Sequence, residues 1–293
     1  MDRTQIQRVR RFNRLVTQRV GALEDHYLSR ARPLGEARLI FEIGADGADA
    51  SSLRAKLGLD SGYLSRLLRS LDAQGLVVVK KTTADARRRR VTLTMKGRAE
   101  LSNYERLSDR LAASFLEPLD AARRDRLVTA MGEVERLLRA AAVEIVEAAA
   151  ASAEARWCLD QYFGELASRF EEGFDPSRDK SGEIGEMTPP AGVFMLARLE
   201  GAPVGCGGLK RVDAATGEIK RVWTAPSARG LGVARRIVRA LEAAAREMGL
   251  TAVRLDTNRA LTEAHQLYRS EGYREVERFG DNPYAHHWFA KPL

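Results

Sequence analysis

Cysteine is scarce in this chain, which has Cys158 and Cys206 as its only two cysteines among 293 residues. Two thiols do not make a disulfide framework, and the cysteines and histidines do not fall into metal-ligand spacing. Cys206 stands in a predicted strand, where a packing thiol is favoured over a nucleophile. We therefore expect neither a disulfide framework nor a metal cofactor.

Long apolar runs are also missing. No stretch approaches 18 consecutive apolar residues, and the N-terminus has no apolar signal-peptide core because it carries Asp2, Arg3, Arg8, Arg10 and Arg11. These absences predict that the chain does not associate with a membrane and that its compartment is the cytoplasm.

Acidic residues are outnumbered by basic residues in the first half only. Residues 1–140 hold 28 of the 48 Lys and Arg residues but 18 of the 40 Asp and Glu residues, so the remainder of the chain is slightly acidic. Such asymmetry suggests that the first half meets a polyanion, although a basic surface that only keeps the protein in solution is the alternative. Length and composition together predict two domains, residues 1–140 and 141–293, with a boundary uncertain by about ten residues.

An apolar stripe runs along residues 2–29, where Gly21 is the only glycine and proline is absent. The apolar positions recur mostly at three- and four-residue steps: Ile6, Val9, Val16, Val20, Leu23 and Tyr27. We expect one long helix whose narrow stripe packs against a partner subunit.

Residues 33–97 follow the order of a winged helix-turn-helix. Helices are predicted over 33–43, 50–57 and 61–74, with Gly58–Asp60 as the tight connection and Gly75 as the stop. The β-branched runs 76–80 and 90–94 then flank a basic segment, which predicts a hairpin wing. Helices over about 97–117 and 121–140 complete a mainly-α domain.

The third helix of the motif and the wing are the predicted DNA-binding surfaces. The helix stripe Leu64, Leu67, Leu68 and Leu71 faces the core, so the solvent face presents Ser61, Tyr63, Ser65, Arg66 and Arg69. In a winged helix this helix enters the major groove of double-stranded DNA, and the wing, with Arg87, Arg88, Arg89 and Arg90, meets phosphates or the minor groove. A solvated basic helix and hairpin are the alternative.

Residues 1–140 resemble the MarR family of winged-helix regulators. The resemblance rests on the segment Leu59–Leu68, on Leu71 and Gly75–Val77, and on the wing, where Arg87 follows Asp85 by two residues. It implies a homodimer, held by the first and last helices of the domain, that binds a palindromic operator. The stripe in residues 2–29 agrees with that expectation.

The second half is predicted to be an α+β domain around one sheet. Strands are expected over 143–147, 192–199, 203–212, 218–224, 252–256, 273–279 and 288–290, and helices over 154–170, 230–248 and 261–270. Between a strand and a helix lies the run Arg229–Ala234, whose glycines let backbone N–H groups approach an anion at the positive end of the helix dipole. The run has neither Rossmann nor Walker spacing, and a glycine-rich turn without a ligand is the alternative.

This run matches the signature of the GNAT superfamily of N-acetyltransferases, in which Arg229, Gly232 and Ala234 take the required places. The segments Glu218–Trp223, Leu255–Asn258 and Ala264–Tyr273 also resemble the superfamily in the correct order. The resemblance covers residues 141–293 and implies a GNAT acyl-CoA N-acyltransferase fold with acetyl-CoA as co-substrate.

The resemblance also implies the site. The fourth and fifth strands splay, the pantetheine arm pairs with backbone at Val222, Trp223 and Thr224, and Asn258 contacts the cofactor or its sulfur region. Diphosphate lies on the Arg229 run, whose binding residues are Arg229, Gly230, Leu231, Gly232, Val233, Ala234 and Arg235. A free amine then attacks the thioester directly.

Two proton transfers need candidates. Glu218 is the candidate base, acting through water, and the alternative is a strand carboxylate paired with Lys220 or Arg221. Tyr268 is the candidate acid, because a phenol with a pKa of about 10 is protonated at neutral pH, and the alternative is a core tyrosine. His286 and His287 point to opposite faces of a strand, so one of them could line the acceptor pocket but they do not easily share a metal.

Together these patterns predict a transcriptional regulator and an N-acetyltransferase in one polypeptide. The expected partners are a DNA operator and a small amine or amino-acid-like acceptor. Substrate or acetyl-CoA binding can alter operator affinity through linkage. Two alternatives remain open: a C-terminal half that only senses acetyl-CoA or a ligand, and an enzyme that acetylates a protein lysine.

Overall fold

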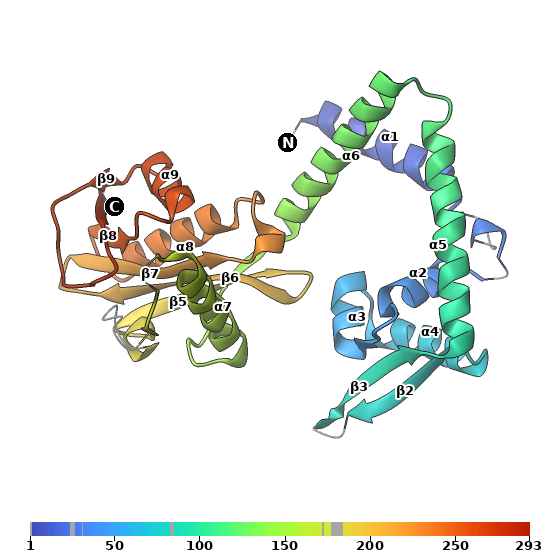
Figure 1. The fold of residues 1–293 in the computed structure, drawn as a ribbon, viewed down its shortest axis with the longest axis horizontal. Coiled ribbons are helices and arrows are strands. Elements are labelled where there is room, and N and C mark those ends of the chain that lie inside the picture. Colours follow the sequence, from blue (N-terminus) through green and yellow to red (C-terminus); the bar gives the residue numbers. More distant parts are fainter. Residues whose placement is uncertain (1, 24–26, 31, 83–84, 172, 177–183) are drawn as a thin grey trace. The chain divides into compact units, whose positions relative to one another are not determined.

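The chain divides into two units, Met1–Ala130 and Met131–Leu293. The computed structural model describes residues 2–23, 27–30, 32–82, 85–171, 173–176 and 184–293, without the side chains of 29, 81, 82 and 85–88 (Figure 1). The division falls inside helix α6 (Ala121–Ala142), and the boundary expected from composition lies near the C-terminal end of the same helix.

The first unit is a mainly helical domain with a small sheet. Its elements are α1 (Arg3–Arg19), η1 (Tyr27–Ser29), α2 (Leu34–Ile43), β1 (Ala48–Asp49), α3 (Ala50–Leu57), α4 (Ser61–Ala73), β2 (Val77–Thr82), β3 (Asp85–Leu93), α5 (Met95–Leu116) and the first part of α6. The strands form an antiparallel sheet in the order β1-β3-β2, and the β2–β3 hairpin is the expected wing (Figure 1). The helices of the motif follow the predicted bounds within one residue.

Helix α4 forms where a cap and an apolar stripe coincide. The Asp60 carboxylate accepts a hydrogen bond from the Tyr63 backbone N–H at 2.8 Å and so caps the N-terminus. The predicted stripe of Leu64, Leu67, Leu68 and Leu71 is buried in the core of the first unit. The opposite face is therefore left to solvent.

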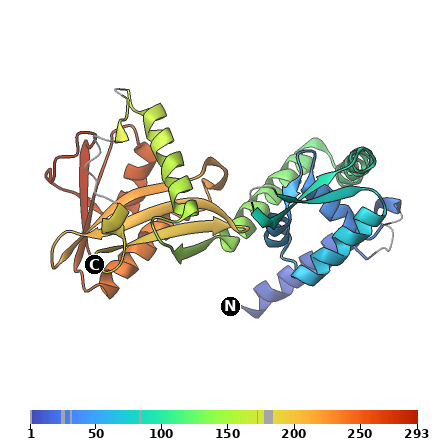
Figure 2. The same ribbon diagram turned by 90° about the horizontal axis from the view of Figure 1, so that it is seen from below.

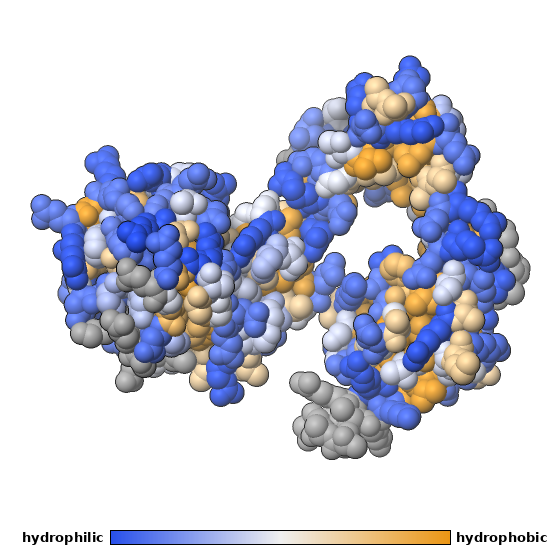
Figure 3. All heavy atoms as spheres, in the orientation of Figure 1, coloured by the Kyte–Doolittle hydropathy of each residue, from blue (hydrophilic) through white to orange (hydrophobic). Residues whose placement is uncertain are grey.

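Helix α1 is shorter than the helix expected over residues 2–29. It ends at Arg19, and Gly21 follows with a φ of 67°, a conformation that does not continue a right-handed helix. No residue of α1 is buried, and its apolar side chains Ile6, Val9, Phe12, Leu15 and Val16 are exposed. Figure 3 shows such hydrophobic side chains reaching the surface of the molecule among hydrophilic ones.

The second unit is built on a seven-stranded mixed sheet in the order β4-β5-β6-β7-β8-β10-β9. The strands are β4 (Glu144–Glu147), β5 (Gly192–Leu199), β6 (Ala202–Arg211), β7 (Thr216–Thr224), β8 (Ala252–Thr257), β9 (Arg274–Glu275) and β10 (His287–Pro292). The helical elements are α7 (Ala153–Arg169), η3 (Ile184–Met187), η4 (Pro226–Ala228), α8 (Val233–Glu247) and α9 (Thr262–Ser270). Strand β9 covers only two of the residues predicted as a strand over 273–279.

Helices α7 and α8 cover opposite faces of the sheet (Figure 2). Alternation along β6 explains this arrangement, because Cys206 faces Cys158 of α7 while its neighbours face α8. A Cβ on Gly207 would come within 2.7 Å of Ile237, so the absence of a side chain lets α8 pack directly on the strand. Both cysteines are free and buried, and burial of Cys206 agrees with the packing thiol expected there.

Strands β7 and β8 separate after a short parallel pairing. They pair only from Thr216↔Ala252 to Glu218↔Arg254, and beyond that point β7 continues to Thr224 without backbone pairing to β8. The register of β7 against β6 also shifts there, leaving Arg221 at a φ of 57° in a β-bulge. The splay expected from the GNAT resemblance is therefore present, and it opens the centre of the sheet.

Among the residues that the structure describes, no helix combines the length and apolar character needed to cross a bilayer. The same residues contain no cluster of three or more His, Cys, Asp or Glu side chains that could hold a metal ion.

Candidate functional site

The N-terminus of α8 lies at the splayed end of β7. Gly230 and Gly232 have φ angles of 77° and 73°, a region that favours glycine, and no described atom lies within 4 Å of the Cβ that either could carry. Gly232 is the N-cap, and it offers no side-chain hydrogen bond to the first turn. The first backbone N–H groups of α8 are therefore open at the positive end of the helix dipole, as an anion site requires.

A groove leads from this terminus along β7. It encloses about 1260 Å³ of empty space, including its opening to solvent. All but one of the residues predicted to bind acetyl-CoA around the glycine run and β7 line it, namely Val222, Trp223, Thr224, Arg229, Gly230, Gly232, Val233, Ala234 and Arg235. The exception, Leu231, is buried in the core.

The groove fits an acyl-CoA in two respects. The hydroxyl of Thr224 is buried and has no hydrogen-bond partner among the described residues, so a polar group of a bound ligand would satisfy it. Arg229 and Arg235 place positive charge on the groove lining beside the open helix terminus, where a diphosphate would lie.

Glu165 of α7 links three residues of the groove lining by hydrogen bonds, a role that the sequence did not predict. Its Oε2 accepts hydrogen bonds from the Trp223 indole at 2.9 Å and from the Arg229 guanidinium at 2.6 Å, while Oε1 accepts one from Arg169 at 3.2 Å. The signal available was a carboxylate on the same helix face as Leu166 and Tyr162, at helical spacing.

The C-terminal turns of α6 support the same loop within the second unit. Arg136 donates to the Gly230 carbonyl at 3.0 Å, and Arg139 donates to the Ser227 carbonyl at 3.4 Å. Arg236 of α8 donates in return to the carbonyls of Ala140 at 3.0 Å and Val143 at 2.7 Å. The loop that ends in the uncapped helix terminus is thus fixed through its backbone.

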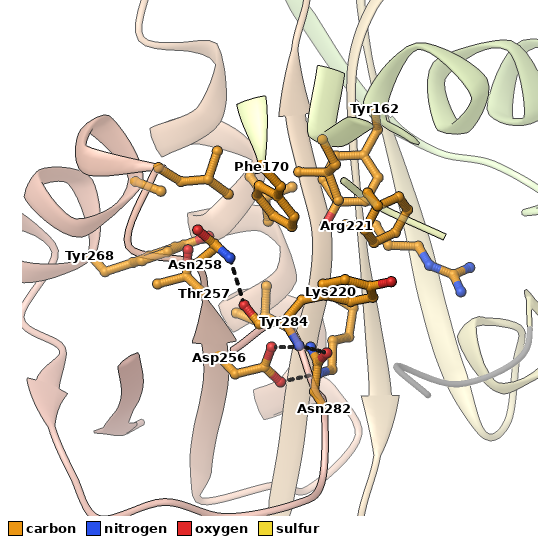
Figure 4. A pocket seen from close by; sticks show the side chains of 16 residues that line it. Tyr162, Phe170, Lys220, Arg221, Asp256, Thr257, Asn258, Tyr268, Asn282 and Tyr284 are labelled. Atoms are coloured by element: carbon orange, nitrogen blue, oxygen red, sulfur yellow. Dashed lines mark hydrogen bonds and ion pairs between the residues drawn. The ribbon is translucent and has the colours of Figure 1, made fainter. Parts of the chain in front are cut away.

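A second cavity opens on the other side of the splay (Figure 4) and encloses about 640 Å³ of empty space, including its mouth. It shares one wall with the groove, formed by Tyr162, Leu166, Val222, Leu261, Ala264 and Tyr268. A ligand in the groove and a ligand in the cavity would therefore meet at this shared wall.

Tyr268 is the titratable residue of α9 on the shared wall. Its side chain is buried, and burial together with the nearby charge of Asp256 raises the pKa of the phenol well above its usual value. The phenol consequently keeps its proton throughout the physiological range. The phenol is therefore in the protonated form that an acid requires, and its ring also packs against Tyr273 and Phe289.

Glu218 lies in a buried ion-pair network and is not among the described residues that line the groove or the cavity. Its carboxylate contacts Lys220 Nζ at 2.8 Å and Arg254 Nε at 2.8 Å, and Lys220 also contacts Asp256. Burial alone would raise the pKa of Glu218, but the charges of Lys220 and Arg254 outweigh it and hold that pKa below its usual value. This geometry favours the alternative of a paired strand carboxylate over a catalytic base, with Arg254 as a partner where Arg221 was considered.

Asn258 lines the cavity and is not among the described residues that line the groove. Its amide donates to the Tyr284 carbonyl at 2.8 Å and accepts from the Ala260 N–H at 2.8 Å, so it fixes the end of β8 to the segment before β10. The two histidines also lie elsewhere: His286 is exposed, and His287 pairs with Glu275 at 2.6 Å.

On the first unit, α4 presents the predicted face. Ser61, Tyr63, Arg66 and Arg69 are exposed, Ser65 is half-buried, and the Arg66 guanidinium lies 5.5 Å from the centre of the Tyr63 ring. On the wing, Arg89 is exposed, while Arg90 donates to the Asp46 carbonyl at 2.8 Å. The side chains of Arg87 and Arg88 lie outside the described residues.

Comparisons with known proteins cover both units. Residues 155–273 match the model of the acetyltransferase (GNAT) family, and residues 39–111 match that of a winged helix DNA-binding domain. An IAA acetyltransferase of Azospirillum brasilense is 31% identical over 128 residues, which are 43% of this chain and 78% of that protein. An uncharacterized N-acetyltransferase of Schizosaccharomyces pombe is 31% identical over 32% of this chain and 60% of its own length.

Solved structures are similar too. An acetyltransferase of the GNAT family from Staphylococcus aureus has a TM-score of 0.46 at 18% identity, over 52% of this chain and 99% of its own. One from Elizabethkingia anophelis with acetyl-CoA bound has a TM-score of 0.38 at 17% identity, over the same shares.

The splayed sheet, the open helix terminus and the family match define the class: this protein is an N-acetyltransferase with an N-terminal winged helix DNA-binding domain. The chain belongs to the GNAT acetyltransferase family.

Proposed function

We propose that this chain acetylates a small amine by direct transfer from acetyl-CoA and that its winged helix binds a DNA operator as a MarR-type regulator. The observation that carries the enzymatic proposal is the wall that the groove and the cavity share, with Tyr268 on it. A groove on one side and a separate cavity on the other give the two substrates a common border.

The proposed chemistry assigns each substrate a place. Acetyl-CoA supplies the thioester, with its diphosphate at the backbone N–H groups of residues 230–235 and its pantetheine arm along Val222–Thr224. The acceptor nitrogen, as the free amine, bonds to the acetyl carbon, the carbon–sulfur bond breaks, the nitrogen loses a proton to water and the sulfur gains one from Tyr268, which recovers its proton from water. Tyr268 holds the proton for the sulfur at its Oη. Glu218 and Lys220 act indirectly: Glu218 pairs with Lys220, and Lys220 holds the Asp256 carboxylate in position.

A small acceptor is favoured over a protein lysine because of the shape of the cavity. Its lining comes from α7, from β7 and β8, and from the segments that contain Phe174 and Tyr284, so it surrounds a ligand on several sides. A lysine on a folded protein would have to reach the shared wall through the mouth of this cavity.

The test is release of free CoA thiol and mass of the acetylated product, measured with small amines and with a lysine-containing peptide. We expect turnover with at least one small amine, at a higher kcat/KM than with the peptide. Binding of acetyl-CoA without turnover on any acceptor would refute the proposed transferase activity and favour a sensor.

The regulatory proposal rests on the exposed basic face of α4 and on the exposed apolar side chains of α1. MarR-type regulators bind palindromic sites as dimers, and we propose that Ile6, Val9 and Phe12 pack against a second copy. Val9→Glu combined with Phe12→Glu should convert a dimer to a monomer in sedimentation analysis. A wild-type protein that sediments as a monomer at micromolar concentration would contradict this arrangement.

A further inference from the structure

The cavity has an aromatic end. Aromatic residues make up only 6% of the chain, yet five of them form a continuous cluster: Tyr162, Phe163, Phe170, Phe174 and Tyr284. Ring centres within this cluster lie 4.9 to 5.9 Å apart. Phe170, Phe174 and Tyr284 line the cavity, and none of these three is among the described residues that line the groove.

The ring of Tyr284 is held in place from three directions. Its carbonyl accepts from Asn258 at 2.8 Å, its backbone N–H donates to Asn282 Oδ1 at 3.1 Å, and its hydroxyl accepts from the Asp175 N–H at 2.9 Å. The phenol is therefore satisfied by the main chain, and the ring presents an apolar face that needs no rearrangement to receive a ligand.

Another part of the cavity is polar. Figure 4 shows Lys220, Asp256 and Asn282 joined there, with Tyr284 beside them and Phe170 and Tyr162 farther away. Asp256 accepts a hydrogen bond from Asn282 at 2.7 Å and pairs with Lys220. Its negative charge also helps to raise the pKa of the Tyr268 phenol on the shared wall. Asp256 lines the cavity, so its carboxylate can accept a hydrogen bond from the N–H of a free amine that is to react there.

We propose that the acceptor is a primary amine carried on a short chain from an aromatic ring. The ring packs against Phe170, Phe174 and Tyr284, and the nitrogen lies at the shared wall between Asp256 and Tyr268. Ring-on-ring packing favours an aromatic ligand over a saturated one of the same shape, because offset and edge-to-face pairs add attraction beyond area burial. This inference rests on the proposed small-amine acetylation.

The experiment compares acceptors that differ only in ring saturation, with the full chain and saturating acetyl-CoA. The pairs are 2-phenylethylamine against 2-cyclohexylethylamine, and phenylalanine against cyclohexylalanine. In the pair that reacts faster we expect the aromatic member to have about a three- to tenfold higher kcat/KM, the range that an aromatic pair contributes. No preference in either pair would overturn the proposal.

Two variants locate the effect. Phe174→Leu and Phe170→Leu remove one ring each while keeping an apolar side chain, so the aromatic preference should fall to within about twofold, chiefly through KM. Phe41→Leu, an exposed aromatic residue of the first unit, is the matched control and should keep the full preference. A preference that survives both cavity variants would place the ring elsewhere and refute this site.

The same assays distinguish a wrong acceptor class from a wrong assignment of acetyltransferase activity. Turnover on the linear amine n-butylamine or on the peptide, with none on any ring-bearing amine, would leave the transferase activity standing and refute the aromatic acceptor alone. Bound acetyl-CoA with no product from any amine or peptide would refute both.

Discussion

The two units of this chain present their functional charges in opposite ways. In the first unit Arg66, Arg69 and Arg89 are exposed, and they lie on one helix and one hairpin. In the second unit Lys220, Glu218 and Asp256 pair with one another beneath a cavity. A polyanion such as DNA is bound by solvent-exposed basic side chains that displace its counterions. A small substrate is bound by groups that the fold has already oriented.

Breaking the buried network should have the largest effect and should be confined to the second unit. Lys220→Met leaves the Glu218 and Asp256 carboxylates without their shared cation, so we expect a loss of about 3–5 kcal/mol in the free energy of unfolding. Trp157, Trp223 and Trp288 all lie in the second unit, so urea unfolding followed by tryptophan fluorescence measures this unit alone.

The matched control is Leu71→Ala, which opens the core of the first unit and should cost about 2–5 kcal/mol there. Its loss should register in far-UV circular dichroism and leave the tryptophan midpoint in place. If each variant moved both signals equally, the two units would unfold as one and the comparison would fail.

Removing the phenol hydroxyl of Tyr268, the candidate acid, should slow the acetyl transfer without changing the affinity for acetyl-CoA or for DNA. Tyr268→Phe keeps the ring in its packed position and deletes only the proton donor, so kcat should fall about a hundredfold. The Kd for acetyl-CoA, measured by calorimetry, and the affinity for DNA should both be unchanged. An unaltered kcat would return Tyr268 to a packing role.

Removing exposed charge from α4 should affect DNA binding alone. Arg66→Ala combined with Arg69→Ala should weaken binding to a duplex from upstream of the coding sequence about tenfold or more. The slope of log affinity against log salt should also fall, by about 1 for each DNA phosphate that the variant no longer neutralises. Fluorescence anisotropy at several salt concentrations measures both quantities. The kcat/KM for the amine should stay at the wild-type value, and equal affinities and slopes would contradict the assignment of α4.

The smallest expected effect is on the pH dependence of stability. Glu218 has a folded-state pKa below its usual value, so its contribution is fully present above about pH 4.5 and is lost as the pH falls through the folded pKa. The urea midpoint reported by tryptophan fluorescence should therefore decline below about pH 4.5. Glu218→Gln should be less stable at neutral pH but show a flatter decline, and parallel curves for the two proteins would count against this origin.

The same contrast explains how much the sequence could predict. The face of α4 follows from helical periodicity alone, because Leu64 and Leu71 fix its orientation and leave Arg66 outside. The open terminus of α8 follows from glycines within one short run. These features are local, and the structure has them where the patterns indicate.

The acceptor cavity could not be predicted in this way. Phe174, Asp256 and Tyr284 come from separate segments, and only the separation of β7 from β8 brings them together. The ion pairing of Glu218 could not be predicted either. Its neighbour on the adjacent strand is Arg254, and sequence spacing does not reveal that these two residues meet. Asn258 stands where the GNAT resemblance expects an asparagine that contacts the cofactor. Its side-chain amide instead donates a hydrogen bond to the Tyr284 carbonyl beside the cavity.

The shared wall has a consequence for how such an enzyme can diversify. Phe170, Phe174 and Tyr284 line the proposed acceptor cavity and not the groove, and they stand at the end of α7 and in loop segments outside the glycine run. Mutations there can change the preferred amine in small steps while the cofactor groove stays intact. Val222 and Tyr268 line both the groove and the cavity, so substitutions that change the bulk of either side chain would alter both hollows at once. Laboratory selection for new acceptors should therefore accumulate substitutions at the three rings and leave the wall unchanged.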